Sequence, residues 1–448
     1  MNTNQKQLKI VLLSPKGPLY RHPRGVFRKM LRAAPLTLTT LAALVPEELN
    51  ASIKIYDEGV EDLPTSLDAD IIGITVITGS ATRSYELADG YRKAGRKVVL
   101  GGPHISLMPE EASEHADAIV TGYAEESWPE LLRDFVAGKM KPRYDMSPDF
   151  SLGNPGMLPF PRRDLLSKKR YLTTNTFEAT RGCVHNCDFC VVPSAWGRRP
   201  FQKPVAHVVE DIRRTGAKRL IFYDLNLIAD RPYAKELFKA LIPLKIKWFG
   251  LSTTLLAEDE ELMDLTVKSG CSGLLIGFES ITPEGLKSIK KRFNRPNLYE
   301  DLISKLHERG ISVMGTFVFG LDHEEKDIFE KVLDFVHSNK VDLPRYAILT
   351  PFPGTPLFTK LDNEGRILTR DWSLYDGQHV VFEPHGFTAQ ELLEGHEWIW
   401  RKSYAYRSMG RRLDIRMPNI TTLVAANFGY RFYAYNLTKF YNCQGGFI

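Results

Sequence analysis

Short apolar segments alternate with helical patterns over most of this 448-residue chain, and this alternation constrains the fold more than any other feature. In the first stretch, from residue 8 to residue 140, the apolar segments are residues 9–14, 51–58, 70–77, 97–102 and 118–122. They are nearly continuous in Val, Ile and Leu, which is typical of parallel strands covered by helices on both faces. Helical patterns lie between them, at residues 37–49, 84–95 and 109–116. This stretch predicts an α/β domain with a doubly wound, Rossmann-like sheet.

A second alternation begins at residue 171 and continues to residue 360. It contains six apolar segments, separated by amphipathic helical patterns, at residues 175–182, 219–226, 247–253, 273–280, 312–320 and 345–352. Six βα units in succession predict a partial parallel barrel, (β/α)6. In barrels of this kind, functional residues gather at the carboxyl ends of the strands.

Two further segments complete the predicted organisation. Residues 141–170 are rich in Pro and Gly and keep no regular period, which predicts a linker. The C-terminal extension has a helical pattern at residues 388–413 and an aromatic tail from Phe428 to Tyr441. We expect this extension to cover the substrate, and its tail could line an apolar pocket, cap the barrel or rest on a lipid surface. The predicted parts are residues 1–140, 141–170, 171–360 and 361–448.

Charge and hydropathy exclude several classes of protein. The formal net charge is +5 and no long block of Lys and Arg occurs, so we predict no nucleic-acid partner. The apolar run Ile10–Leu13 is too short for a signal peptide. No apolar stretch reaches the roughly 18 residues that a membrane span needs. The predicted location is therefore the cytoplasm.

Three of the five cysteines are clustered. Cys183, Cys187 and Cys190 lie within eight residues in a CxxxCxxC pattern, whereas Cys271 and Cys443 stand alone and are predicted to be ordinary thiols. Three thiolates at this spacing can hold three corners of a 4Fe–4S cluster and leave the fourth iron open to a ligand. The pattern therefore predicts a metal-binding site with an open coordination position.

The alternative is a structural zinc site, completed by His185 or Asp188 within the same segment. Structural zinc sites usually bring a small module of their own. Here the cysteines directly follow a predicted strand and precede a βα series, which favours the iron–sulfur cluster.

The cysteine segment resembles that of the radical S-adenosylmethionine (SAM) superfamily, in which CxxxCxΦC follows the first strand of a six-fold βα series. Phe189 stands at the aromatic position. The resemblance implies that the open iron binds SAM and that one electron from the cluster cleaves SAM to methionine and a 5′-deoxyadenosyl radical. It also implies an electron donor such as a flavodoxin or ferredoxin. The residues implied to contact SAM, at successive strand ends, are Asp224, Asn226, Ser252, Glu279 and Thr316.

One strand departs from the superfamily pattern. The second strand lacks the Gly-Gly-Glu that usually holds the SAM amino group and has Asp224 and Asn226 instead. This variant is usual in the cobalamin-linked branch, but it leaves the amino contact open. Polar residues at strand ends also cap helices, so each position has a purely structural alternative.

The first domain resembles the cobalamin-binding domain that precedes many radical SAM barrels. Glycines after parallel strands allow the backbone to approach a large planar ligand, and threonines could hydrogen-bond a nucleotide tail beside the sheet. The alternative is a flavodoxin-like domain without a cofactor. The residues implied to bind cobalamin are Thr75, Thr78, Gly101, Gly102, His104, Gly122 and Tyr123.

The usual D-x-H-x-x-G cobalt-ligand motif is absent. His22 and Gly25 have the right spacing, but Tyr20 replaces the aspartate that would orient the imidazole. We therefore expect His22 to be a surface residue rather than the axial ligand. His104 is expected to shape the loop near the cofactor.

The two resemblances together indicate a cobalamin-dependent radical SAM enzyme. They extend over about residues 8–410 and are strongest to the branch that contains the anaerobic magnesium-protoporphyrin cyclase and the hopanoid and bacteriochlorophyll methylases. The branch implies methylation of an unactivated carbon of a small, lipid-like or tetrapyrrole molecule, with both cofactors facing one pocket between the domains. The alternatives are a radical SAM cyclase, hydroxylase or skeletal-rearrangement enzyme, and a non-enzymatic iron–sulfur or zinc protein.

Overall fold

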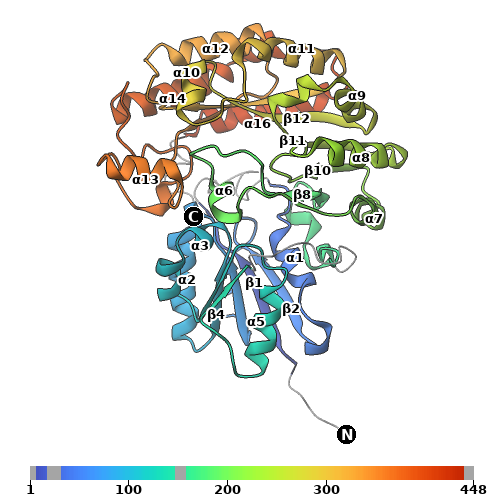
Figure 1. The fold of residues 1–448 in the computed structure, drawn as a ribbon, viewed down its shortest axis with the longest axis vertical. Helices are drawn as coiled ribbons and strands as arrows, with labels where there is room; N and C mark the ends of the chain where they lie inside the picture. The colour runs from blue at the N-terminus through green and yellow to red at the C-terminus, as the bar shows by residue number, and fades with distance from the viewer. Residues whose placement is uncertain (1–6, 18–31, 147–157, 438–448) are drawn as a thin grey trace.

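The computed structural model describes residues 7–17, 32–146 and 158–437. Two α/β domains are stacked along the long axis of the molecule, with the N-terminal domain in blue and the second domain in green to red (Figure 1). His22 and Cys443 lie outside the described residues, so the predictions made for them stay predictions.

The first domain is built on one parallel sheet with the strand order β2-β1-β3-β4-β5-β6. Alternate residues of β1 enter different cores, because Val11 and Leu13 pack on one face of the sheet and Ile10 and Leu12 on the other. This confirms the doubly wound arrangement. The strands are β1 (Lys9–Ser14), β2 (Ser52–Asp57), β3 (Ile71–Thr75), β4 (Lys97–Gly101), β5 (Ala118–Thr121) and β6 (Arg143–Asp145).

Strand β6 pairs with β5 and lies within the segment predicted to be a linker. Only Tyr144 of its three residues is buried, so the strand has no apolar run by which to recognise it. The helix predicted over residues 37–49 is also wrong in length and ends at Ala43, ahead of Pro46, which cannot continue a helix. The helices of this domain are α1 (Thr37–Ala43), α2 (Ala81–Lys93), α3 (Pro103–Leu107), α4 (Pro109–Glu114) and α5 (Ser127–Val136).

The second domain has a six-stranded parallel sheet in the sequential order β14-β13-β12-β11-β10-β7, which confirms the predicted partial barrel. The first predicted strand is divided in two: β7 joins the barrel sheet, and β8 (Thr180–Arg181) pairs antiparallel with β9 (Phe201–Gln202). The barrel strands are β7 (Thr176–Phe177), β10 (Arg219–Phe222), β11 (Lys247–Ser252), β12 (Cys271–Glu279), β13 (Ser312–Phe319) and β14 (Arg345–Ile348).

The two faces of the barrel sheet differ in burial. One face carries fully buried side chains, such as Trp248, Phe278 and Phe317, in a core shared with the surrounding helices (Figure 1). These helices are α7 (Val205–Thr215), α8 (Arg231–Leu241), α9 (Glu260–Lys268), α10 (Pro283–Ser288), α11 (Tyr299–Glu308) and α12 (Ile328–Ser338). The alternate residues form the inner face, which is also apolar but only half-buried: Ile221, Phe249, Leu251, Leu275, Met314 and Val318.

The C-terminal extension packs against the barrel as helices α14 (Ala389–Ser403), α15 (Tyr406–Arg412) and α16 (Ile420–Ala434). The single helix predicted over residues 388–413 is therefore wrong, because the chain leaves the helical conformation at Ala405. The aromatic tail is helical as far as α16 extends. Asn419, at the start of α16, donates to the carbonyl of Ser272 at 3.0 Å, which holds this helix at the amino end of β12. None of the described helices combines the length and the apolar character needed to cross a bilayer.

Candidate active site

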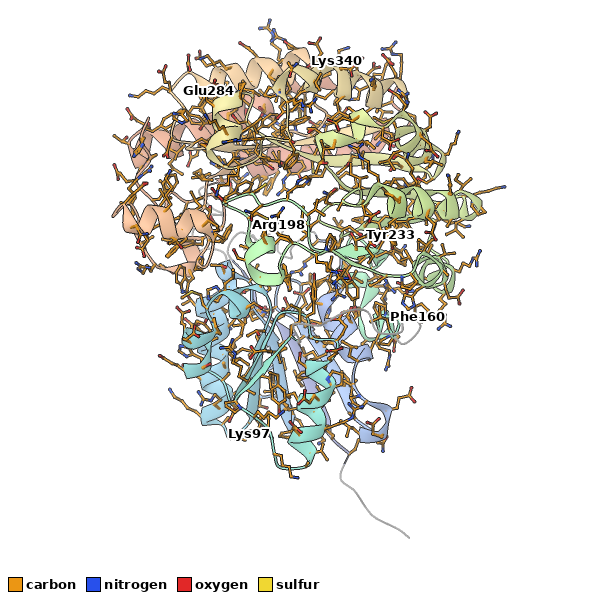
Figure 2. The ribbon with its side chains drawn as sticks, viewed as in Figure 1. Lys97, Phe160, Arg198, Tyr233, Glu284 and Lys340 are labelled. Carbon is orange, nitrogen blue, oxygen red and sulfur yellow. The ribbon has the colours of Figure 1, made fainter. Side chains whose placement is uncertain are left out.

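The cysteine loop follows β8 and leads into α6 (Val191–Trp196), which lies between the two domains (Figure 1). Cys190 N donates to the carbonyl of Cys187 at 3.1 Å. Arg198, also between the domains in Figure 2, donates Nε to the carbonyl of Val184 at 3.2 Å. All three cysteines have free thiols and are only partly buried. The loop is thus held through its backbone, and none of its three thiols forms a disulfide.

Asp224 anchors the segment that precedes this loop. Its side chain is fully buried and accepts hydrogen bonds from Ala179 N, at 3.1 Å, and from both the N–H and the hydroxyl of Thr180. Burial, together with the nearby charge of Glu178, raises the pKa of Asp224 to about 7. The carboxylate predicted to hold the SAM amino group is therefore hydrogen-bonded to the segment that directly precedes the cysteines.

Asn226 is directed at the cysteines themselves. Its Nδ2 lies 3.9 Å from Cys183 Sγ, within the range of a weak N–H···S hydrogen bond. Such bonds to cluster sulfurs raise the reduction potential of an iron–sulfur centre. Burial raises the pKa of Cys187 to about 12, so a thiolate there needs the positive charge that cluster iron supplies.

Glu279 and Thr316 meet on the inner face of the barrel. Thr316 Oγ1 lies 3.4 Å from Glu279 Oε2, and Lys291 Nζ donates to Glu279 Oε1 at 2.6 Å. Glu279 and Lys291 occupy the space next to Gly277, where a Cβ atom would lie 2.4 Å from the Glu279 carboxylate. The positive charge of Lys291 also acts to lower the pKa of Cys187, although burial raises that pKa more. Lys291 was not predicted as a site residue.

The third strand presents a different residue from the one predicted. Ser252 is buried on the helix-covered face and donates to the carbonyl of Thr253 at 3.3 Å. Thr253 follows on the inner-face register, and its Oγ1 is buried and has no hydrogen-bond partner among the residues that the structure describes. A buried hydroxyl without a partner costs free energy unless a ligand satisfies it. Thr253 thus fits a SAM contact better than Ser252 does.

The two candidate zinc ligands have other partners. The imidazole of His185 stacks on Phe293 with ring centroids 3.7 Å apart, and Asp188 forms an ion pair with Lys290 at 3.0 Å. Within the described part of the chain, no three His, Cys, Asp or Glu side chains lie close enough together to hold a single metal ion.

The cobalamin residues of β3 and β4 lie at adjacent strand ends, where Thr75 pairs with Gly101. Gly102 has a φ of +110°, and a Cβ atom there would lie 2.7 Å from the carbonyl of Val76. The fold itself therefore requires this glycine. Ile77, the second residue after β3, is 51% exposed, so the edge of the sheet presents apolar surface.

Thr78 and His104 form a polar network with the C-terminal extension. His104 is fully buried, with Nδ1 3.2 Å from Thr78 Oγ1 and Nε2 3.4 Å from Glu111. Trp372 Nε1 donates to the same Glu111 carboxylate at 3.1 Å. Although burial opposes it, these hydrogen bonds lower the pKa of Glu111. His104 thus fixes the loop after β4 against residues that follow the barrel.

Tyr123 joins the two domains. Its ring stacks on Trp196 of α6, and the Arg181 guanidinium lies 5.5 Å from its centroid. Glu125, two residues further along, forms an ion pair with Arg181, which also pairs with Glu178 at 2.7 Å. Arg181 lies two positions before Cys183, so the loop after β5 is bonded directly to the cysteine segment. The amide of the neighbouring Gly122 donates to Ser106 Oγ at 2.8 Å.

Large apolar side chains are exposed at strand ends in both domains. Ile77 follows β3, and Leu225, which is 46% exposed, follows β10. Ligands of parallel sheets bind at the carboxyl ends of the strands, so these two side chains are candidates for contact with a corrin ring. These residues, together with the three thiols and the unpaired hydroxyl of Thr253, fit a cluster, SAM and cobalamin.

Comparisons with known proteins identify the family. Residues 177–336 match the model of the radical SAM superfamily, and residues 19–132 match that of the B12 binding domain. Bacteriochlorophyllide d C-12(1)-methyltransferase of Chlorobaculum tepidum is 32% identical over 85% of this chain and 84% of its own length. The chain belongs to the cobalamin-binding radical SAM family. A 4Fe–4S cluster, SAM and cobalamin are the cofactors of this family.

Two further matches agree with this assignment. The anaerobic magnesium-protoporphyrin IX monomethyl ester cyclase of Cereibacter sphaeroides is 24% identical over 82% of this chain and 66% of its own length. The structure of TsrM, a radical SAM methyltransferase from Kitasatospora setae, has the same fold, with a TM-score of 0.61, 19% identity and coverage of 80% of this chain and 78% of that one. The predicted branch and fold are thus confirmed.

Proposed function

We propose that this radical SAM enzyme methylates an unactivated carbon of a large apolar small molecule, a tetrapyrrole. The observation that carries the proposal is the half-buried apolar inner face of the barrel, formed by residues such as Phe249, Leu251 and Leu275. An apolar substrate gains free energy when it covers such a surface, whereas a polar metabolite gains little. The bacteriochlorophyllide methyltransferase relative supports the choice of substrate class.

The residues of the proposed site fall into those that would bind the cluster and SAM and those that position these residues. Cys183, Cys187 and Cys190 hold the cluster. Lys291 and Thr253 are the residues that would contact the carboxylate of SAM. When bound, the cofactors supply one-electron cleavage of SAM and the methyl group to be transferred.

Other residues position these groups. Asp224 and Asn226 fix the cysteine loop, and Glu279 and Thr316 orient Lys291. The ends of β3 and β4, with Thr75 and Gly101, face the corrin. The electron comes from a flavodoxin or ferredoxin, and the enzyme works in the cytoplasm.

Methyl-labelled SAM tests the proposal. The anaerobically reconstituted enzyme, given cobalamin, a reductant and bacteriochlorophyllide, should form 5′-deoxyadenosine and a product that carries the label. The variant Cys183→Ala/Cys187→Ala/Cys190→Ala is the control and should form neither product.

Two outcomes would contradict the proposal. Deoxyadenosine with a modified but unlabelled product would instead support a cyclase, hydroxylase or rearrangement enzyme, which the cyclase relative keeps as the second candidate. Labelling of a hopanoid lipid but not of a tetrapyrrole would overturn the substrate class and leave methyl transfer standing.

A further inference from the structure

The outer surface of the C-terminal helices carries exposed aromatic side chains. Tyr406, on α15, is 63% exposed, and Phe428, on α16, is 52% exposed, with their rings 6.2 Å apart. Tyr435, directly after α16, is 48% exposed. Exposed aromatic residues that neighbour one another are uncommon on a surface that meets only water.

Arginines accompany these rings. The Arg431 guanidinium lies 3.9 Å from the ring centroid of Tyr406 and 4.3 Å from that of Tyr435. Arg407 and Arg411 are exposed one helical turn apart on α15. Neither has an ion-pair or hydrogen-bond partner among the residues that the structure describes. We call this set the C-terminal surface: Tyr406, Arg407, Arg411, Phe428, Arg431 and Tyr435.

The charge of the chain is concentrated in the same segment. Residues 398–448 contain eight Lys and Arg but a single acidic residue, Asp414, so their net charge is +7, whereas the whole chain carries +5. The rest of the protein is therefore slightly acidic. Arg412 is fully buried, and Arg401 and Arg416 form ion pairs with Glu397 and Asp414. The cations that the C-terminal surface offers an anionic partner are therefore Arg407, Arg411 and Arg431.

We propose that the C-terminal surface binds an anionic lipid bilayer at its interface, without crossing it. Tyr and Phe rings are favoured at the level of the lipid headgroups, and arginine side chains there contact phosphate groups while their stems stay in apolar surroundings. A basic, aromatic helical face lying in the plane of a membrane has this composition. Such contact would bring the enzyme to apolar molecules dissolved in the membrane.

A second copy of the chain fits this surface less well. A twofold interface would place this surface against its own copy, so both partners would bring Arg407 and Arg411 to the same contact. Like charges in a desolvated contact repel each other strongly. An anionic bilayer has the opposite sign and is the partner that the charge complements.

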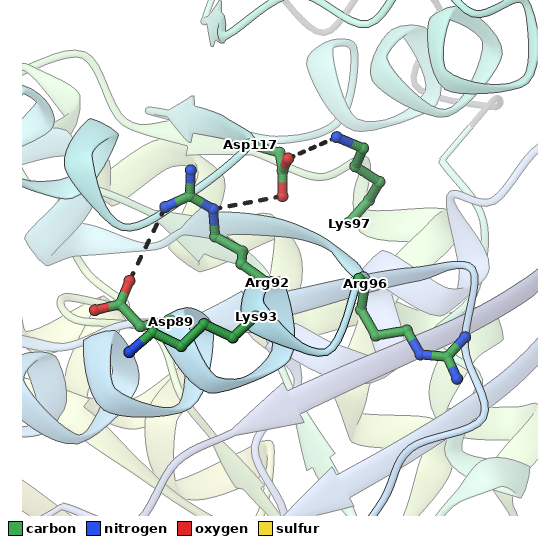
Figure 3. Close-up of a pocket in the computed structure, with 7 residues that line it drawn as sticks. Asp89, Arg92, Lys93, Arg96, Lys97 and Asp117 are labelled. Carbon is green, nitrogen blue, oxygen red and sulfur yellow. Dashed lines mark hydrogen bonds and ion pairs between the residues drawn. The ribbon is translucent and has the colours of Figure 1, made fainter.

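The first domain contains another group of cations, which makes a useful contrast. A pocket of about 590 Å³ is lined by Arg92, Lys93, Arg96 and Lys97 (Figure 3). Asp117 in this pocket pairs with Lys97 at 2.8 Å and with Arg92 at 3.7 Å, so part of the charge is neutralised. No aromatic side chain lines it. We therefore expect the cations of this pocket not to bind vesicles.

Vesicle sedimentation with the full-length holoenzyme tests the proposal. Wild type should bind vesicles that contain phosphatidylglycerol and bind pure phosphatidylcholine vesicles much more weakly. Arg407→Gln/Arg411→Gln should lower the affinity for anionic vesicles about thirtyfold, because each arginine near such a surface contributes about fivefold. Lys93→Gln/Lys139→Gln removes the same charge from the first domain and should bind as wild type does.

The aromatic side chains are tested separately. Tyr406→Ser/Phe428→Ser should also weaken binding, although its charge is unchanged. Equal binding of wild type to both kinds of vesicle, no binding to either, or an equal loss in the Lys93→Gln/Lys139→Gln variant would overturn the proposal. A dimer that dissociates in Tyr406→Ser/Phe428→Ser, with no vesicle binding by wild type, would assign the surface to a second copy instead. SAM cleavage in solution should be the same in all these variants. A negative result for membrane binding can therefore be distinguished from a negative result for the proposed function.

Discussion

The residues predicted to bind SAM and those predicted to bind cobalamin differ in what they contact. On the SAM side, Glu279 and Thr316 lie together on the inner face, and Asn226 reaches a cluster cysteine. On the cobalamin side, His104 contacts Trp372 of the C-terminal extension, and Tyr123 contacts Trp196 of the second domain. Asn226, Glu279 and Thr316 thus lie at the proposed cofactor site, whereas His104 and Tyr123 join separate parts of the chain.

This difference follows from the way the domains meet. Both parallel sheets direct their carboxyl ends toward the same space, where ligands of such sheets bind. A polar residue at a strand end can therefore serve either a cofactor or the opposite domain. The barrel supplies the thiols, so its strand ends surround them, while strand ends of the first domain also have to hold the two halves together. Substitutions on the two sides should have different effects.

The largest effect is expected at the cluster. Cys187→Ala removes one of three ligands, so the purified protein should lose its iron–sulfur absorption and all SAM cleavage. Cys271→Ala is the matched control, since Cys271 is a buried thiol in the barrel core. That variant should keep the cluster and lose about 1 kcal/mol of stability. Iron content and deoxyadenosine formation measure both, and a fully active Cys187→Ala protein would refute the assignment of the cluster.

The second prediction concerns the anchor of the cysteine loop. Asp224→Ala leaves the N–H groups of Ala179 and Thr180 buried without an acceptor, so the loop should lose its fixed position. We expect a 10–100-fold lower cluster affinity, about the effect of losing a supporting group around a metal site. Asp230→Ala, which removes only the cap of α8, is the control. Iron retained during dialysis against a chelator measures the difference; equal retention would show that Asp224 does not position the loop.

The sequence predicted the barrel better than the site within it. Apolar runs such as 273–280 identify their strands, and the cysteine spacing identifies the cluster. Lys291 escaped prediction because it comes from the segment after α10. Its partner Glu279 lies where the β12–β13 register shifts and has a φ of +62°, which the sequence does not reveal. The sequence predicted Ser252 rather than Thr253 as the SAM contact, because the face on which a residue at a strand end lies depends on how the strand is paired. Contacts between domains, such as Glu125 with Arg181, leave no local pattern.

The third prediction tests the bond between the domains. Glu125→Gln removes the charge that pairs with Arg181 but keeps the shape of the side chain, so the two cofactor sites should lose their fixed separation. SAM cleavage should continue while methylated product falls about tenfold, because a small misplacement of reacting groups is costly. The ratio of deoxyadenosine to labelled product measures this uncoupling. Glu126→Gln, next to it, is the control, and a proportional fall of both products would indicate a loss of folding rather than of alignment.

The smallest effect is expected in the network around His104. Glu111→Gln can keep its hydrogen bond from Trp372, so stability at neutral pH should fall by only about 1 kcal/mol, with SAM cleavage unchanged. The pKa of Glu111 is lower in the folded protein than the ordinary value of 4.5, so its contribution to stability is complete above that pH and is lost as the pH falls below it. The melting temperatures of wild type and variant should therefore converge on acidification. A variant that retains its stability but loses cobalamin would instead place this network at the corrin, and the contrast between the two sides would fail.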